Sequence, residues 1–216
     1  MNNFLLFDFD GTITRTDTTK YLVLELLKLR PFRIFGITNN ILKMIFSKNE
    51  KIIQKSKNEI LGYLIDGLNI YDIEKICKNF NSVALPLFRS SIIMKINNSI
   101  SEGHKILIVT ASPQFAVQAC FSSSSIFVLG TKYRQCKKIY TRELQGIPCY
   151  GENKVILISE WVSKNSFYPR FLEGWSDSFS DRHMLKLATE RFWIGNKRQI
   201  KKLKVLDSEA NFVLEE

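Results

Sequence analysis

Cysteine and histidine are scarce in this sequence, which has four cysteines and two histidines among 216 residues. The cysteines form no CxxC pair and have no companion histidine pattern; they are Cys77, Cys120, Cys136 and Cys149. This argues against a zinc site and a disulfide framework, and it suits a reducing compartment. We therefore expect four ordinary core or surface thiols.

A membrane span and a signal peptide are also missing from the pattern. The segment from Tyr21 to Phe46 is rich in Leu, Ile and Phe, but its longest uncharged stretch, residues 34–42, has nine residues. A spanning helix needs about 18. The first apolar stretch, "FLLF", ends at an acid, so no signal peptide is predicted. We expect a cytoplasmic protein that is not secreted.

Positive charge, in contrast, is in excess, with a formal net charge of +10. This excess favours an anionic partner: a phosphate-rich substrate, an anionic membrane surface or nucleic acid. The basic clusters, such as "KYRQCKK" and "NKRQIKKLK", are typical of solvated faces, and no pattern of a nucleic-acid-binding module occurs. Nucleic-acid binding is therefore not expected. Peripheral contact with the inner face of an anionic membrane stays open, as does the oligomeric state.

Short apolar runs alternate with helical periodicity over most of the chain. Strands are predicted at residues 3–9, 105–110, 125–133, 137–144, 171–175 and 191–195, the last being the expected final strand of the core. Helices are predicted at residues 113–121, 152–162 and 181–188. This alternation predicts an α/β fold with a Rossmann-like, mostly parallel sheet and helices on both faces. A hairpin between 125–133 and 137–144 is one arrangement of these two segments.

Residues 21–80 break the alternation, because their apolar residues recur at helical spacing only. Four stripes begin at Leu22, Ile34, Ile53 and Ile73, and Pro31 separates the first two. We therefore predict an all-helical cap at residues 16–83, inserted between two parts of a catalytic core at residues 1–15 and 84–216.

The stretch "FDFDGT", residues 7–12, brings two acids to an abrupt glycine. Asp8 and Asp10 are two residues apart, so in a strand both side chains point the same way and repel each other. A simple turn is an alternative. A calcium loop does not fit, since the glycine comes at the fourth position and Phe9 is apolar. The pair therefore predicts a cation between the carboxylates.

Further polar residues stand where other strands are predicted to end. Thr110 closes the strand at 105–110, and Lys154 stands at the start of the helix that follows "CYGEN". Asp177 and Asp181 follow the strand at 171–175. Ligands of parallel sheets bind beyond the carboxyl ends of the strands, so we expect these side chains to converge with the two acids.

Hydrolysis of a phosphate ester gives a reason for these residue types. One carboxylate can attack phosphorus and form an aspartyl-phosphate, while a second protonates the leaving oxygen and then activates water. A hydroxyl and a lysine can hold phosphate oxygens, and Mg²⁺ prefers hard oxygen ligands. The set of residues therefore indicates a phosphatase.

The motifs "DFDGT", the hydroxyl of Thr110, the later lysine and "SDSFSD" resemble, in this order, the haloacid dehalogenase superfamily of phosphatases. The resemblance is to the phosphoserine phosphatase-like branch with a helical cap, and it covers the whole chain. The resemblance implies Mg²⁺ as the cofactor and an aspartyl-phosphate as the intermediate. It implies that Asp8 is the nucleophile, that Asp10 is the general acid and base, and that Thr110 and Lys154 bind phosphate, with Lys154 also neutralising charge. The metal site would consist of Asp8, Asp10 (through its carbonyl), Asp177 and Asp181.

Two departures from the family pattern concern one loop. His183 stands where relatives often have proline, and Arg182 beside it is bulky. Both put the shape of the loop in doubt, but not the metal. His183 is close enough to Asp181 to line the mouth of the site, whereas His104 is expected in solvent.

The phrases "VTASPQFAV", "YGENKVILISEW" and "GWSDSFSD" are similar to those of phosphatidylglycerophosphatase C-type enzymes. This similarity implies a phosphorylated lipid headgroup, such as phosphatidylglycerophosphate, as the substrate. The alternative is a soluble small metabolite, such as phosphoserine or a sugar phosphate. The segment from Tyr21 to Phe46 would accordingly be either an interfacial membrane surface or an ordinary buried pair of cap helices.

Overall fold

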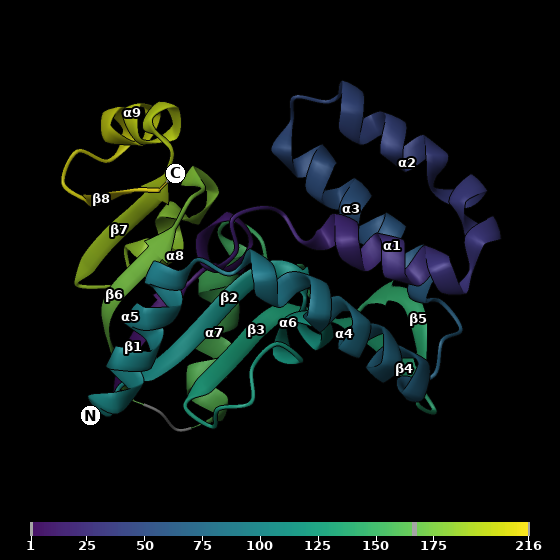
Figure 1. Cartoon of the computed structure of the whole chain (residues 1–216), viewed down its shortest axis with the longest axis horizontal. Helices are drawn as coiled ribbons and strands as arrows, with labels where there is room; N and C mark the ends of the chain where they lie inside the picture. The colour runs from purple at the N-terminus through teal and green to yellow at the C-terminus, as the bar shows by residue number, and fades with distance from the viewer. Residues whose placement is uncertain (1, 166–167, 216) are drawn as a thin grey trace.

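A six-stranded sheet forms the centre of the computed structural model, which describes residues 2–165 and 168–215 (Figure 1). The strand order is β3-β2-β1-β6-β7-β8, and all neighbouring pairs are parallel. The strands are β1 (Asn2–Phe7), β2 (Lys105–Pro113), β3 (Ile126–Thr131), β6 (Pro169–Ser176), β7 (Glu190–Gly195) and β8 (Asn211–Leu214). The predicted α/β fold class is confirmed.

Helices cover both faces of this sheet, because successive residues of a strand point to opposite sides. Leu5 and Phe7 of β1 pack with α5 (Ser90–Ser101) and α6 (Gln114–Gln118). Phe4 and Leu6 pack on the other face. That face is covered by α7 (Asn153–Lys164), α8 (Arg182–Leu185) and α9 (Lys197–Leu206). Burial on both faces explains the continuous apolar run of β1.

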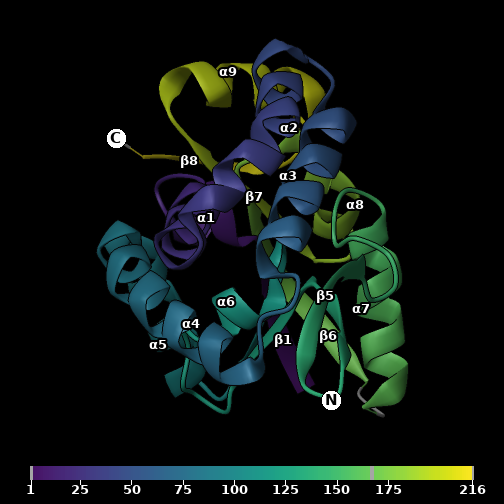
Figure 2. The same ribbon diagram turned by 90° about the vertical axis from the view of Figure 1, so that its right-hand side faces the viewer.

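The α-helices between β1 and α5 lie to one side of the sheet (Figures 1 and 2). They are α1 (Thr19–Leu29), α2 (Ile34–Phe46), α3 (Glu50–Ile65) and α4 (Ile70–Ala84), with short turns at η2 (Pro31–Arg33) and η3 (Leu85–Leu87). The side chains of Asn49 and Asn69 cap α3 and α4 by accepting backbone N–H groups. The four stripes are therefore helices, as expected. The domain limits stay a prediction.

An antiparallel hairpin, β4 (Tyr133–Cys136) and β5 (Ile139–Leu144), packs against α3. Tyr133 and Tyr140 of the hairpin share one buried cluster with α1 to α4. Gly62 of α3 allows the approach, since a Cβ there would lie 2.4 Å from the carbonyl oxygen of Arg142. A hairpin that includes residues 139–144 agrees with the predicted arrangement. The predicted strand 125–133 is divided, however: Ile126–Thr131 forms β3 of the main sheet, and Tyr133 begins β4 of the hairpin.

Several strand limits differ from the prediction; β2 continues to Pro113 and does not end at Thr110, and β6 spans Pro169–Ser176. β1 ends at Phe7, so Asp8 and Phe9 lie outside it. The strand β7 is not the last, because α9 leads into β8, which pairs with β7 at the edge of the sheet. The helix α9 begins with a capping box of Asn196 and Gln199 inside a segment that the sequence presents only as basic. Short edge elements carry too few apolar residues for a clear periodic signal.

Within residues 2–165 and 168–215, no helix is long and apolar enough to cross a membrane.

Candidate active site

A cavity of about 400 Å³ opens beyond the carboxyl ends of β1, β2 and β6. All six residues that the sequence singled out line it: Asp8, Asp10, Thr110, Lys154, Asp177 and Asp181. They come from distant segments of the chain, from Asp8 near its start to Asp181. The six side chains therefore converge at one edge of the sheet.

The tight loop Phe9–Ile13 directs the two N-terminal acids. The N–H of Asp8 donates to the carbonyl oxygen of Trp175 at 3.0 Å, which ties the end of β1 to β6. Gly11 then has a φ of +82°, and a Cβ on it would lie 2.2 Å from the Asp177 carboxylate. Only glycine fits both the turn and the close carboxylate. The loop, and not the alternation of a strand, brings Asp8 and Asp10 to the cavity.

A chain of buried charged groups runs from Asp8 into the wall of the cavity. Lys154 Nζ lies 2.7 Å from Asp8 Oδ1 and 2.8 Å from Asp181 Oδ1. The hydroxyl of Ser176 donates to the other oxygen of Asp181 at 2.8 Å. Lys154 and Asp181 are each only 2% exposed. Because both Asp181 oxygens are engaged, its hydrogen bonds favour a role in orienting Lys154; direct metal ligation by Asp181 stays a prediction.

The carboxylates of this chain strongly affect one another. Burial, with the neighbouring Asp181 and Asp177 carboxylates, raises the pKa of Asp8 well above its ordinary value, and Lys154 opposes the rise. Burial alone would lower the pKa of Lys154, but the Asp181 and Asp8 carboxylates outweigh it and raise that pKa. Lys154 is therefore firmly protonated at neutral pH.

Asp10 is held by hydrogen bonds to both of its carboxylate oxygens. The N–H and the hydroxyl of Thr18 donate to Oδ1, each at 2.6 Å, and the hydroxyl of Ser112 donates to Oδ2 at 2.5 Å. Burial, followed by the charge of Asp17, raises the pKa of Asp10 despite these donors. A fixed carboxyl group with a raised pKa suits a general acid.

Thr110 and Asp177 complete the set. Thr110 is buried, and its hydroxyl oxygen accepts the N–H of Ser112 at 3.1 Å. This bond leaves the hydroxyl proton of Thr110 for another acceptor. The half-buried Asp177 accepts a bond from the hydroxyl of Thr12 at 3.4 Å. Burial, and then repulsion by Asp181, raises the pKa of Asp177 to about 7.

The charges around the cavity fit a divalent cation. Five carboxylates line it, those of Asp8, Asp10, Asp17, Asp177 and Asp181, against the three cations Arg15, Lys57 and Lys154. Within the described ranges, no three His, Cys, Asp or Glu side chains already form a metal-binding group. Mg²⁺ does not need one, since it keeps several waters and binds through one or two carboxylates plus substrate phosphate.

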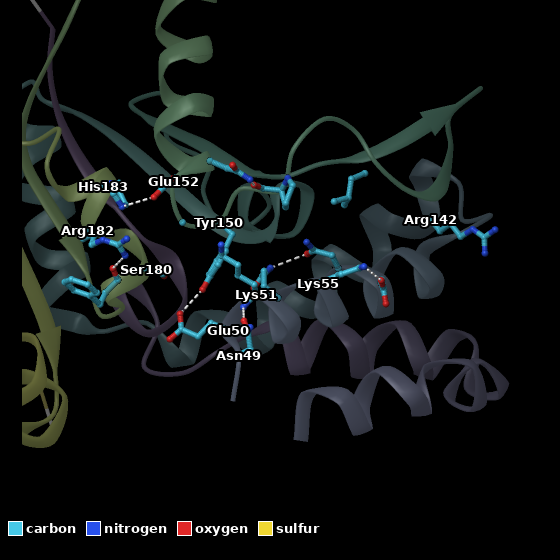
Figure 3. Close-up of a pocket in the computed structure, with 18 residues that line it drawn as sticks. Asn49, Glu50, Lys51, Lys55, Arg142, Tyr150, Glu152, Ser180, Arg182 and His183 are labelled. Carbon is cyan, nitrogen blue, oxygen red and sulfur yellow. Dashed lines mark hydrogen bonds and ion pairs between the residues drawn. The ribbon is translucent and has the colours of Figure 1, made fainter. Parts of the chain in front are cut away.

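A larger cavity of about 1070 Å³ adjoins this one and shares Gln54, Asn58, Tyr150 and Ser180 with it (Figure 3). It lies between the N-terminal part of α3 and the core segments around Tyr150 and the start of α8. The hydroxyl of Tyr150 donates to Glu50 at 2.8 Å and thereby joins the two sides. His183 lines this larger cavity and not the smaller one, with Nε2 at 3.2 Å from Glu152 Oε1. His104 lines neither cavity.

Sequence reasoning missed the residues that position the acids. Thr18 and Ser112 hold Asp10, and Ser176 holds Asp181. Ser112 stands in the phrase "VTASP" that carries Thr110, so its place two residues after Thr110 was an available signal. Lys57, which forms an ion pair with Asp17 beside the cavity, had no signal, because two other lysines on the same helix look alike in the sequence.

Known proteins share this fold at low sequence identity. A protein with unknown function from Bordetella pertussis Tohama I is 15% identical with a TM-score of 0.69, and the match covers 99% of this chain and 98% of that one. A phosphoserine phosphohydrolase-like protein from Francisella tularensis subsp. tularensis SCHU S4 is 15% identical, with a TM-score of 0.61 and coverage of 99% and 95%. Cytosolic 5'-nucleotidase IIIB bound to cytidine is 13% identical, with a TM-score of 0.63 and coverage of 100% and 80%. None of the curated protein sequences matches the chain.

The sequence pattern of the haloacid dehalogenase-like hydrolases matches residues 5–186, a range that contains all six candidate residues. The match confirms the expected superfamily and a hydrolase as the class of enzyme, and the neighbouring folds agree with the phosphoserine phosphatase-like branch. The chain therefore belongs to the haloacid dehalogenase-like hydrolase family.

Proposed function

We propose that this protein is a Mg²⁺-dependent phosphomonoester hydrolase that works through an aspartyl-phosphate. The observation that carries the proposal is the buried contact between Asp8 and Lys154 in the same cavity as Asp10, which is held at both oxygens. A nucleophile, an acid and a positive charge are the three groups that displacement at phosphorus needs.

In the first step, a carboxylate oxygen of Asp8 attacks phosphorus as the bond to the leaving oxygen breaks. Asp10 gives its proton to that oxygen, and the alcohol departs. In the second step, Asp10 takes a proton from water, the water oxygen attacks phosphorus, and the bond to Asp8 breaks to release phosphate. Lys154 and Thr110 hold phosphoryl oxygens in both steps.

Asp8, Asp177 and the backbone carbonyl of Asp10 would hold the magnesium ion, which would supply positive charge for the phosphoryl oxygens and relieve the repulsion between carboxylates. Asp181 keeps Lys154 directed at Asp8, as the two bonds from Lys154 indicate. The same arrangement excludes most water from the nucleophile, since Asp8 is only 7% exposed.

We further propose a phosphorylated lipid headgroup, such as phosphatidylglycerophosphate, as the substrate. The larger cavity supports this choice, because it offers room for a leaving group and carries Lys51, Lys55, Arg142 and Arg182. Its three acids are Glu50, which accepts a bond from Tyr150, Glu59, which pairs with Lys55 at 3.9 Å, and Glu152, which lies 3.2 Å from His183; the four cations therefore exceed the acids by one. A leaving group with a second phosphate would meet this positive charge. The phosphoserine-related neighbouring fold favours the alternative, a soluble small metabolite.

Phosphate release from a substrate panel tests both statements. With Mg²⁺, we expect kcat/KM for phosphatidylglycerophosphate to exceed that for phosphoserine by about tenfold or more, a difference of about 1.4 kcal/mol in transition-state binding. With EDTA, release from both should fall to background. Faster release from phosphoserine would overturn the lipid assignment, and undiminished release in EDTA would overturn the metal.

Asp177→Asn tests the metal site independently of turnover. Burial raises the folded-state pKa of Asp177 to about 7, above the unfolded value of about 3.9. The folded protein therefore favours the protonated carboxyl group, and the stability that this group contributes is lost as pH rises from about 3.9 through about 7. We expect the variant to raise the unfolding temperature of metal-free protein by roughly 2–4 °C near pH 8, and less near pH 5. Added Mg²⁺ should stabilise the wild type but not the variant in a thermal scan. Equal stabilisation of both would show that Asp177 is no ligand.

A further inference from the structure

The helix α2 is apolar on two opposite sides. Ile37, Ile41 and Met44 point inward to the buried cluster shared with α1, α3 and α4. The opposite side carries Phe35, Leu42 and Phe46, which are seven and four residues apart and so form one stripe. A helix that is apolar all round is normally buried on all sides. In this protein only one side of α2 is covered.

The uncovered side is exposed to an unusual extent. Phe32, just before α2, is 85% exposed, and Phe46 at its end is 80% exposed. The same surface includes Phe35, Leu42 and Ile45, all of which are exposed. In Figure 1, α2 forms the outer edge of the helical group, away from the sheet. We call these five apolar residues the α2 surface. Single exposed apolar residues are ordinary, but a contiguous group marks a binding surface.

The charge around the α2 surface identifies its partner. From residue 26 to residue 49 the chain has five basic residues and no acidic one. Lys43 and Lys48 flank Ile45 and Phe46, and the guanidinium of Arg33 contacts the carbonyl and the ring of Tyr63, both of which are uncharged. We propose that the α2 surface inserts into the interface of an anionic phospholipid bilayer, with these cations on the headgroups.

A second copy of this chain is a less suitable partner. In a symmetric pair the α2 surface of one copy would meet that of the other, so both sets of basic residues would face each other. Glu25 pairs with Lys28 at 2.5 Å, but the range 26–49 holds no acidic residue that could neutralise Arg33, Lys43 and Lys48. An anionic bilayer meets both features at once, since its interface takes up aromatic side chains and its headgroups attract lysine.

The position of α2 connects this surface to the site, a link that rests on the proposed function. The chain leaves α2 at Phe46 and enters α3 at Glu50, and Asn49, Glu50 and Lys51 line the larger cavity. Insertion of Ile45 and Phe46 would therefore hold the mouth of this cavity near the headgroups. A lipid phosphate could then reach Asp8 without leaving the bilayer.

Sedimentation with vesicles tests the proposal without any substrate. We expect the protein to bind vesicles of phosphatidylcholine containing phosphatidylglycerol, and to bind vesicles of phosphatidylcholine alone at least about tenfold more weakly. The double variant Phe35→Ser/Phe46→Ser should lower the partition coefficient by about tenfold or more. The matched control Tyr71→Ser/Val205→Ser removes two other apolar residues, 69% and 83% exposed, and should bind like the wild type.

The pair Lys43→Glu/Lys48→Glu keeps the apolar residues and should also lose most binding to the anionic vesicles. Circular dichroism and turnover of p-nitrophenyl phosphate at wild-type levels would show that each variant is folded. Wild type that does not sediment with anionic vesicles would overturn the proposal. So would a wild-type dimer in solution that Phe35→Ser/Phe46→Ser converts to a monomer. Asp8→Asn should bind vesicles normally, so a failure of the proposed chemistry is distinguishable from a failure of docking.

Discussion

Asp8→Asn should lower the rate of phosphate release by a factor of about 10⁴ or more, because it removes the proposed nucleophile. Asparagine has nearly the same shape and can still accept a bond from Lys154, which lies 2.7 Å from Asp8 Oδ1 in the wild type. The change also removes one of several mutually repelling buried carboxylates. We therefore expect a folded protein with an unfolding temperature equal to or above that of the wild type, measured alongside malachite-green phosphate assays.

The matched control for this variant is Asp72→Asn, an acid on α4 that lines neither cavity. It should retain wild-type turnover. If Asp8→Asn itself keeps a rate near wild type, another residue attacks phosphorus and the proposed mechanism is wrong. A rapid-quench experiment that traps phosphate on the wild-type protein, and none on the variant, would locate the bond on Asp8.

Lys154→Met should give the largest loss of stability, about 3–5 kcal/mol near neutral pH. The change leaves Asp8 and Asp181 buried without the ammonium group that contacts both. The folded-state pKa of Asp8, which burial already raises, then rises further above its unfolded value. The stability that protonated Asp8 contributes is lost as pH rises through that raised value. Urea unfolding should therefore show a larger defect near pH 8 than near pH 5.

Two further variants separate charge from packing in this prediction. Lys95→Met removes an ion pair with Glu173 at 2.6 Å whose lysine is 37% exposed, and it should cost at most about 1 kcal/mol. The double variant Asp8→Asn/Lys154→Met should recover part of the lost stability, because one uncompensated carboxylate is gone. A defect in Lys154→Met that is the same at both pH values would mean that lost packing, and not buried charge, causes it.

The fold could be predicted well wherever the apolar pattern is long and periodic. β1, β2 and α7 lie close to their expected positions because their residues are buried in one consistent pattern. The edge strand β8 was missed because its four residues are stabilised by pairing with β7 and not by a pattern of their own. The predicted end of β1 is two residues too late, because Asp8 and Phe9 continue the strand-like sequence pattern although the strand itself ends at Phe7.

The sequence by itself determined which chemical groups are present and near which ends of strands they stand: two acids before Gly11, a threonine, a lysine and later acids. Only the tertiary structure decided that Lys154 bridges Asp8 and Asp181, and that Thr18 and Ser112 hold Asp10. It also decided that one apolar side of α2 is covered and the other is not. The physical reason is that hydrogen-bond partners and burial depend on segments far apart in the chain, whereas periodicity records only neighbours along it.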